Sequence, residues 1–412
     1  MTTFGIVFLA AVALSTATRL WLEWRHLKHV KAFRDRVPAA FSERITPTAH
    51  QKAADYTCAK TRLRMVSIAV DAMIVLALTF GGLLQLLQNI SGEWTSGGIL
   101  GGLLLIVLVM VLLTVLETPF SYYRVFSIEE RFGFNRMTPA LFFADMAKSA
   151  LLAAAFGLPL AAVVLWLMKQ AGPYWWIYVW IVWVVFNTFV LMIYPTWIAP
   201  LFNKFSPMED PEIRERVEHL LARCGFRVKG LVVMDGSRRS VHGNAYFTGF
   251  GTAKRIVFFD TLLAALDPPE VEAVLAHELG HFKLHHVLKR MIWLFLTSLV
   301  FLALLGYVIG EGWFYAGLNV ATPSTAVALI LFFIVAPHFS FVLQPLAAMY
   351  SRKHEFEADQ YAVSKASARD LIAALIKLYK DNASTLTPDP LHSAFYDSHP
   401  PAVVRIARLQ NA

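Results

Sequence analysis

Charged residues are scarce in this sequence of 412 residues. Asp, Glu, Lys and Arg make up 16% of it, whereas a soluble domain has about 25%. Hydrophobic residues make up 57%, and so little charge cannot cover the surface of a soluble protein of this length. Only two cysteines occur, Cys58 and Cys224, too few for a disulfide scaffold. These absences exclude an ordinary soluble enzyme, a disordered chain and a disulfide-rich fold, and they predict an integral membrane protein.

Seven apolar stretches are long enough to cross a bilayer as helices, which takes roughly 20 residues each. They cover residues 4–22, 65–88, 98–117, 148–169, 174–198, 290–310 and 325–348. The first stretch could be mistaken for a signal peptide, but basic residues follow it instead of preceding it, so we expect a retained anchor. Only Asp71 lies well inside a predicted span, which gives little support to an ion or proton relay.

Lysine and arginine are concentrated in some of the connections and missing from others. Residues 25–64 hold ten of them, whereas residues 89–97 and 311–324 hold none. Short cytoplasmic loops are enriched in Lys and Arg, so we expect the N-terminus outside or in the lumen and the polar stretch 200–290 in the cytoplasm. Both cysteines would then be free thiols in a reducing compartment. The basic loops are expected to touch anionic lipids, and no nucleic-acid module is visible.

The polar stretch between residues 200 and 289 contains short runs of β-branched and aromatic residues. Residues 230–234 and 256–259 have this composition and are bounded by Gly and Asp, which predicts strands. A third run, from Asn244 to Phe250, leads into a turn at Gly249 and Gly251. We expect a small antiparallel sheet here.

The strongest motif is His277-Glu278-Leu279-Gly280-His281, on a helix that Asp267-Pro268-Pro269-Glu270 would begin. His277 and His281 stand one turn apart, so their imidazoles can bind one metal ion. Glu278 lies beside them and can accept a proton from water. This order is the zinc-peptidase signature, and it predicts one catalytic zinc ion.

A catalytic zinc ion needs a third protein ligand, and the short metzincin continuation that would supply a histidine is absent. Past the last span, Glu355 and Asp359 share a helix face, while Glu357 points roughly the other way. We assign Glu355 as the third ligand and Asp359 as the acceptor for the second nitrogen of a ligating histidine. On spacing alone, the segment could equally be a solvated helix face.

The predicted His helix runs directly into the sixth span, and the predicted Glu helix emerges from the seventh. The metal would then lie at the cytoplasmic ends of two membrane helices. His285 and His286 follow the motif beside basic residues and are interpreted as interfacial, not as ligands. The predicted organisation has four parts: spans one to five with their loops in 1–199, the zinc protease domain in 200–289, spans six and seven in 290–348, and the rest of the protease domain with its third ligand in 349–412.

With these residues in place, the sequence resembles the type-1 CAAX prenyl endopeptidases, a family of seven-span membrane zinc proteases. The resemblance extends over most of the chain and is carried by Ile128–Asn135, Tyr194-Pro195 through Lys204, Asn244-Ala245-Tyr246, Ser351–Asp359, and Ser398-His399-Pro400-Pro401 followed by Arg405.

The resemblance implies a mainly α-helical integral membrane protein. Its seven transmembrane helices would form a barrel-like chamber, with a gluzincin-like α+β zinc metalloprotease domain on the cytoplasmic face. It supports Glu355 as the third ligand and implies that Asn244 and Ala245 lie on an edge strand that binds extended substrate. His399 becomes a candidate donor to the oxyanion, with Arg405 as its support or as a substrate anchor.

We therefore expect a zinc endopeptidase that releases the C-terminal tripeptide from prenylated CAAX-type substrates. A broad-specificity quality-control zinc protease is the alternative, and a transporter or receptor with a structural zinc site is the remote one. The expected partners are a lipidated or membrane-embedded substrate and membrane lipids, with the enzyme as a monomer. The expected membrane is an inner membrane in a bacterium, or the endoplasmic reticulum or another internal membrane in a eukaryote.

Overall fold

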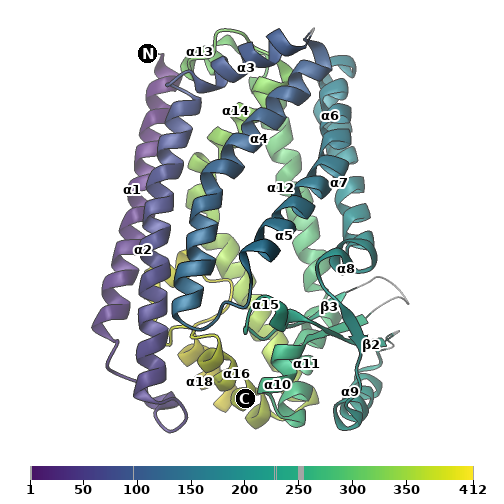
Figure 1. The fold of residues 1–412 in the computed structure, drawn as a ribbon. Coiled ribbons are helices and arrows are strands. Elements are labelled where there is room, and N and C mark those ends of the chain that lie inside the picture. The colour runs from purple at the N-terminus through teal and green to yellow at the C-terminus, as the bar shows by residue number, and fades with distance from the viewer. Residues whose placement is uncertain (1, 96, 227, 229, 249–254, 412) are drawn as a thin grey trace.

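The computed structural model describes the whole chain except residues 1, 96, 227, 229, 249–254 and 412 (Figure 1). Long helices fill one part of the molecule, with the N-terminus at its far end. A smaller part of short helices and strands lies at the opposite end, together with the C-terminus (Figure 1). The chain enters this smaller part after the fifth span, leaves it for two more long helices, and returns to it.

Six helices of the described residues are long and apolar enough to cross a membrane, or seven if one bent pair counts as a single span. The helices of the long part are α1 (Thr3–Ala32), α2 (Pro47–Leu78), α3 (Leu83–Trp94), α4 (Gly98–Tyr123), α5 (Pro139–Leu152), α6 (Leu158–Gln170), α7 (Trp175–Ile193), α8 (Ala199–Phe202), α12 (His286–Val308), α13 (Gly312–Gly317), α14 (Thr325–Ser340) and α15 (Gln344–Lys365). The predicted multi-span architecture is confirmed.

The predicted second span, 65–88, is wrong as one continuous helix. The helix starts much earlier, at Pro47, because Thr46 caps it and proline fits the first helical position. It ends at Leu78, and Gly82 then takes a left-handed conformation with φ 72°. Glycine adopts this conformation without the steric cost that other residues meet. Helix α3 therefore leaves α2 at an angle of 57°.

The protease part contains a four-stranded sheet with the order β1-β2-β4-β3. Its strands are β1 (Phe205–Pro207), β2 (Gly230–Met234), β3 (Ala245–Thr248) and β4 (Arg255–Phe259). The three predicted strands are confirmed, β1 was not predicted, and the predicted turn at Gly249 and Gly251 lies outside the described residues. The expectation of an antiparallel sheet is wrong in one respect: β2 and β4 run parallel, because the chain between them crosses over through β3. Strand β3 lies at the edge of the sheet.

Helices pack around this sheet and bury one apolar core. They are α9 (Pro211–Cys224), α10 (Asp260–Ala265), α11 (Pro268–Lys283), α16 (Ala368–Asp381), α17 (Pro390–Tyr396) and α18 (Ala402–Gln410). Leu275 and Leu279 of α11 are fully buried against Val217 and Leu220 of α9. Because α11 lies inside this core, the polar side chains on its other face are held rigidly. Cys58 and Cys224 are buried free thiols, as expected.

Helix α11 does not run directly into the sixth span, which corrects that expectation. It ends at Lys283, His285 takes a left-handed conformation with φ 56°, and α12 starts at His286. Non-glycine residues seldom adopt this conformation, because the Cβ atom approaches the backbone. The break changes the direction of the chain between His281 and His286.

Candidate metal centre

Helix α11 carries His277, Glu278 and His281 and is fixed at its start. Asp267 and Glu270 form the capping box that the sequence predicts. Lys377 of α16 lies 2.7 Å from both of these carboxylates and links the start of α11 to the neighbouring helix. Glu270 is buried, so its ion pair with Lys377 is shielded from solvent on the side of the carboxylate.

Helices α11 and α15 approach each other closely at Gly280. A Cβ atom at Gly280 would lie 3.0 Å from the Cα of Ala358 and 3.1 Å from its carbonyl oxygen. Such contacts are tighter than backbone atoms normally allow, so glycine permits the close approach. The approach brings Glu355 and Asp359 of α15 opposite His277 and His281.

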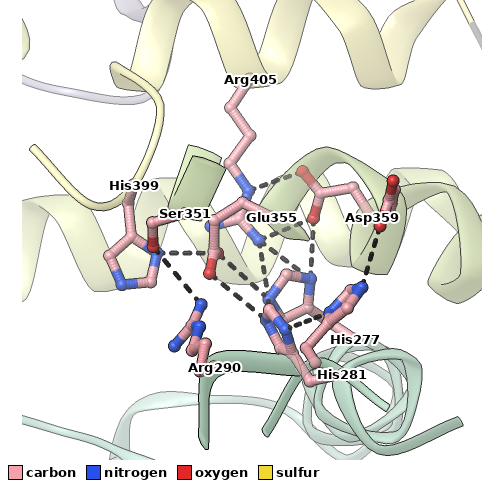
Figure 2. Close-up of polar contacts among 10 residues, drawn as sticks. His277, His281, Arg290, Ser351, Glu355, Asp359, His399 and Arg405 are labelled. Atoms are coloured by element: carbon pink, nitrogen blue, oxygen red, sulfur yellow. Dashed lines mark hydrogen bonds and ion pairs between the residues drawn. The ribbon is translucent and has the colours of Figure 1, made fainter. Parts of the chain in front are cut away.

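The three predicted ligands meet at one point (Figure 2). His277 Nε2 and His281 Nε2 are 3.2 Å apart, and the Glu355 carboxylate oxygens lie 3.5 Å from the first and 3.3 Å from the second. Donors 2.0–2.1 Å from a tetrahedral metal ion stand about 3.3 Å from one another. Two imidazoles and one carboxylate at these separations therefore fit a catalytic zinc ion with a fourth position open to substrate.

Asp359 lies beside the second nitrogen of His277: its Oδ1 is 2.9 Å from His277 Nδ1. Burial and the charge of Arg405 lower the pKa of His277, but the Asp359 and Glu355 carboxylates outweigh both, so that the net shift is upward. An acceptor at Nδ1 keeps the proton on that nitrogen when Nε2 serves a metal. Asp359 thus fixes the tautomer and orientation of His277.

Arg405 supports this carboxylate. Its Nε and Nη2 donate to the two oxygens of Asp359 at 2.7 and 2.6 Å, and Nη2 also lies 3.1 Å from His277 Nδ1. Burial lowers the pKa of Arg405, but the bond to Asp359 raises it above its usual range, so the guanidinium stays charged. The side chain is 6% exposed and holds Asp359, so Arg405 positions this carboxylate. Its expected role as a support of His399 or as a substrate anchor stays a prediction.

His399 comes from the loop before α18 and lies on the other side of Glu355 from Asp359 (Figure 2). Its Nδ1 is 2.7 Å from Glu355 Oε2, while 63% of its side chain is exposed. Glu278 is half-buried beside His277 on α11. Neither side chain is fully buried, which leaves both accessible from outside the protein core.

Arg352 holds the loop of His399 in place, a role that sequence reasoning did not assign. Its Nη1 donates to the carbonyl oxygens of Ser393 and Asp397 at 3.1 and 2.8 Å. Arg352 lies one turn before Glu355 on α15. The same helix therefore supplies a ligand and anchors the segment that carries His399.

The interpretation of His286 as interfacial is wrong. His286 is 1% exposed, and its Nδ1 lies 2.9 Å from His281 Nδ1. Its Nε2 lies 2.9 Å from Glu357 Oε2, and its ring stacks on that of His354. His285, in contrast, is exposed. Continuous helical spacing would have placed His286 away from His281, and the left-handed residue at position 285 reverses that direction.

Asn244 and Ala245 lie at the start of the edge strand β3, which packs beside α11. The Asn244 carbonyl accepts from Phe259 of β4 at 2.9 Å. Because pairing alternates along an antiparallel strand, the main chain of Ala245 and of Phe247 points away from β4. The Asn244 side chain accepts from the Ala245 N–H at 2.8 Å, so a polar group already occupies this free edge.

The segment Ile128–Asn135 packs against the residues that lead into β3. Tyr56 donates to Glu129 at 2.6 Å, and His242 Nε2 lies 3.6 Å from the same carboxylate. Asn135 pairs with Ser240 in an isolated β-bridge. A loop between two membrane helices thus positions the strand beside the metal site.

A cavity of about 650 Å³ opens next to His399. Residues of α1, α2 and α4 line it, together with the segment Ser398–Ala402. Charged side chains stand in its wall, including Lys60, Arg64 and Glu117. The cavity therefore lies between the loop of His399 and the helical part of the molecule.

Comparison with known proteins supplies two family matches. Residues 26–204 match the family described as CAAX prenyl protease N-terminal, five membrane helices, and residues 207–412 match peptidase family M48.

Individual proteins match over nearly the whole chain. A CAAX prenyl protease 1 homolog of Arabidopsis thaliana is 36% identical, covering 88% of this chain and 87% of its own. One of Dictyostelium discoideum is 33% identical, covering 98% and 96%. The crystal structure of S. mikatae Ste24p superposes with a TM-score of 0.93 at 28% identity, covering 99% of each chain.

Proposed function

This chain belongs to peptidase family M48, among the CAAX prenyl proteases, and from that premise we propose that it removes the C-terminal tripeptide of prenylated membrane substrates. It is a multi-span membrane protein and a zinc metallopeptidase. The observation that carries the proposal is the meeting of His277, His281 and Glu355 at the ends of membrane helices, beside the free edge of β3.

We propose that His277, His281 and Glu355 hold one zinc ion per chain. When bound, the metal supplies Lewis acidity, which polarises a peptide carbonyl and acidifies water. The separations of the three donors and the buried carboxylate behind His277 support this assignment. Arg405 acts through Asp359 and keeps that carboxylate ionised where it holds His277.

Glu278 is proposed as the general base. It would take the proton of the attacking water and deliver it to the leaving amine, which requires a carboxylate within hydrogen-bond reach of both. Its position directly after His277, at the half-buried face of α11, supports this role. His399 is proposed to donate a hydrogen bond to the oxyanion that forms at the carbonyl, because its exposed ring lies against Glu355.

The substrate is proposed to bind as an additional strand along β3. Main-chain pairing orients a peptide without demanding particular side chains. The Ala245 N–H would exchange its bond with Asn244 for a bond to the substrate. The cavity beside His399 would receive the part of the substrate that continues into the membrane region.

We propose the orientation that the basic loops predict, with the metal site on the cytoplasmic side and the N-terminus outside or in the lumen. The enzyme would act as a monomer, since one chain supplies every residue of the site.

The test uses purified protein with a farnesylated CAAX peptide and its unlipidated twin, each with and without a metal chelator. We expect cleavage directly after the farnesylated cysteine, a much slower reaction of the twin, and loss of both reactions with chelator until zinc is restored. Equal cleavage of the two peptides, or cleavage that persists after metal removal, would contradict the proposal.

A further inference from the structure

His286 lies directly behind the ligand His281, and both of its ring nitrogens have partners. Nδ1 is 2.9 Å from His281 Nδ1, and Nε2 is 2.9 Å from Glu357 Oε2. The imidazole is 1% exposed, so water does not compete for either nitrogen. His281 of α11, His286 at the start of α12 and Glu357 of α15 thus form one line that ends at the metal site.

Metal binding at His281 allows only one arrangement of protons along this line. A neutral imidazole that offers Nε2 to a metal carries its hydrogen on Nδ1. His281 Nδ1 then donates to His286 Nδ1, which must accept. The hydrogen of His286 is therefore on Nε2, from which it donates to Glu357.

Each of the two ligating histidines is then connected to a carboxylate through its Nδ1 atom. His277 Nδ1 meets the Asp359 carboxylate directly, at 2.9 Å. His281 Nδ1 reaches the Glu357 carboxylate through His286. A carboxylate behind a ligating histidine fixes its tautomer and raises its basicity, and disturbing such a partner costs about 10- to 100-fold in metal affinity.

We propose that His286 and Glu357 form a relay that positions His281 and strengthens its bond to the metal. The inference rests on the proposed metal site at His277, His281 and Glu355. His286 and Glu357 act through His281, so they are positioning residues and do not touch the substrate.

A second metal ion held by His286, His354 and Glu357 is the competing interpretation, because donor atoms of these three residues lie within 4.8 Å of one another. The Nδ1 atom of His354 is buried and has no hydrogen-bond partner among the described residues. However, the rings of His286 and His354 stack in parallel, with centroids 4.0 Å apart and planes 8° apart. Their lone pairs lie in the ring planes and do not point to a common centre.

The proton arrangement also opposes a second metal ion. A metal bound to His286 Nε2 would place the hydrogen of that ring on Nδ1. It would then face the hydrogen on His281 Nδ1 across 2.9 Å, so two donors would meet without an acceptor. The relay gives His281 Nδ1 and both nitrogens of His286 a partner, whereas a second metal ion leaves two donors facing each other.

The test measures metal release from the purified full-length protein into a chromogenic chelator. His286→Leu and Glu357→Leu remove the relay, and we expect metal release about 10- to 100-fold faster in both. His286→Gln offers one acceptor and one donor in the same place. We expect it to release metal within about threefold of the unchanged protein, a rescue that packing alone would not produce. His354→Phe is the matched control, since it keeps the stacked ring and has no part in the relay.

Unchanged metal release in His286→Leu would overturn the relay. Two metal ions per unchanged chain, falling to one in His354→Phe, would overturn it in favour of a second site. His281→Ala separates this inference from the proposed function. If His281→Ala loses the metal and His286→Leu keeps it, the relay alone fails. If His281→Ala also keeps the metal, the proposed metal site itself is wrong.

Discussion

Arg405 and Asp359 form a buried two-point ion pair that stands directly behind a metal ligand. Two guanidinium nitrogens donate to the two carboxylate oxygens at 2.7 and 2.6 Å, and both side chains are at most 6% exposed. A planar guanidinium matches a carboxylate in this geometry, which an ammonium group cannot reproduce. The pair joins the C-terminal helix α18 to α15 and sets the position of His277.

Arg405→Met should therefore weaken both the fold and the metal site. It leaves the Asp359 carboxylate buried without its cation, a change that costs about 3–5 kcal/mol of stability. We expect a lower thermal unfolding midpoint and faster metal release. Arg408→Met is the control, because Arg408 is exposed and its guanidinium lies over the ring of Phe356.

The double variant Arg405→Met with Asp359→Leu separates the two effects. Replacing a buried ion pair by apolar side chains often restores stability. We expect the unfolding midpoint to recover, while metal release stays fast because His277 has lost its acceptor. A midpoint of Arg405→Met equal to that of the control would refute a structural role for the pair.

Glu278→Gln should retain the metal and lose turnover. The amide keeps the shape of the side chain but cannot take a proton from water, and removing a general base lowers kcat by about 10²- to 10⁴-fold. Metal content per chain and the cleavage rate of a farnesylated peptide are measured together. Glu272→Gln is the control on the same helix, where Glu272 pairs with Arg216 and Arg223. A variant that retains full turnover would exclude Glu278 as the base.

Sequence reasoning could place His277 and His281 side by side because helix geometry alone brings residues four apart onto one face. The capping residues Asp267 and Glu270 were also local features, and they form the expected capping box. Glu355 was different. Its spacing on α15 left a solvated face equally open, and only the resemblance to a family favoured it. The close approach at Gly280, which brings α15 to α11, is a property of tertiary packing.

His286 could not be placed from the sequence, because one backbone conformation decides its direction. On a continuous helix, a residue five positions after His281 points away from it. The left-handed His285 breaks the helix and returns His286 to the site. The bend after Leu78 was also hard to predict, because the apolar run from 65 to 88 continues through it. Within that run, the glycines were the local feature that could have indicated a break.

If the substrate pairs with β3, the contribution of its backbone amides to binding should alternate from one residue to the next. In an antiparallel pair, alternate residues of the added strand bond to the free edge and the others face away. N-methylation of successive substrate amides should therefore raise KM only at alternate positions. Each lost hydrogen bond is worth about 0.5–1.5 kcal/mol, or roughly 2- to 12-fold in KM. A uniform effect along the peptide would speak against strand addition.

Asp389 should make stability depend on pH. Its buried carboxylate accepts from Arg25 of α1 at 2.9 and 3.0 Å and caps α17 through the N–H groups of Leu391 and His392. Burial raises the pKa of Asp389, but these donors outweigh it and hold the pKa below its usual value of 3.8. A lowered pKa in the folded state means that the carboxylate stabilises the protein above about pH 4, and that this contribution is lost as the pH falls further.

Asp389→Asn keeps the helix cap and removes the charge. We expect it to lose about 1.5–3 kcal/mol of stability at pH 7, the usual worth of a hydrogen bond to a charged group. The difference in unfolding midpoint between the variant and the unchanged protein should shrink as the pH is lowered below about 4, because Asp389 then becomes protonated in the unchanged protein as well. Asp381→Asn, at the exposed end of α16, should show little difference at any pH. A difference for Asp389→Asn that stays constant down to the lowest pH would mean that the charge of Asp389 does not stabilise the contact between α1 and α17.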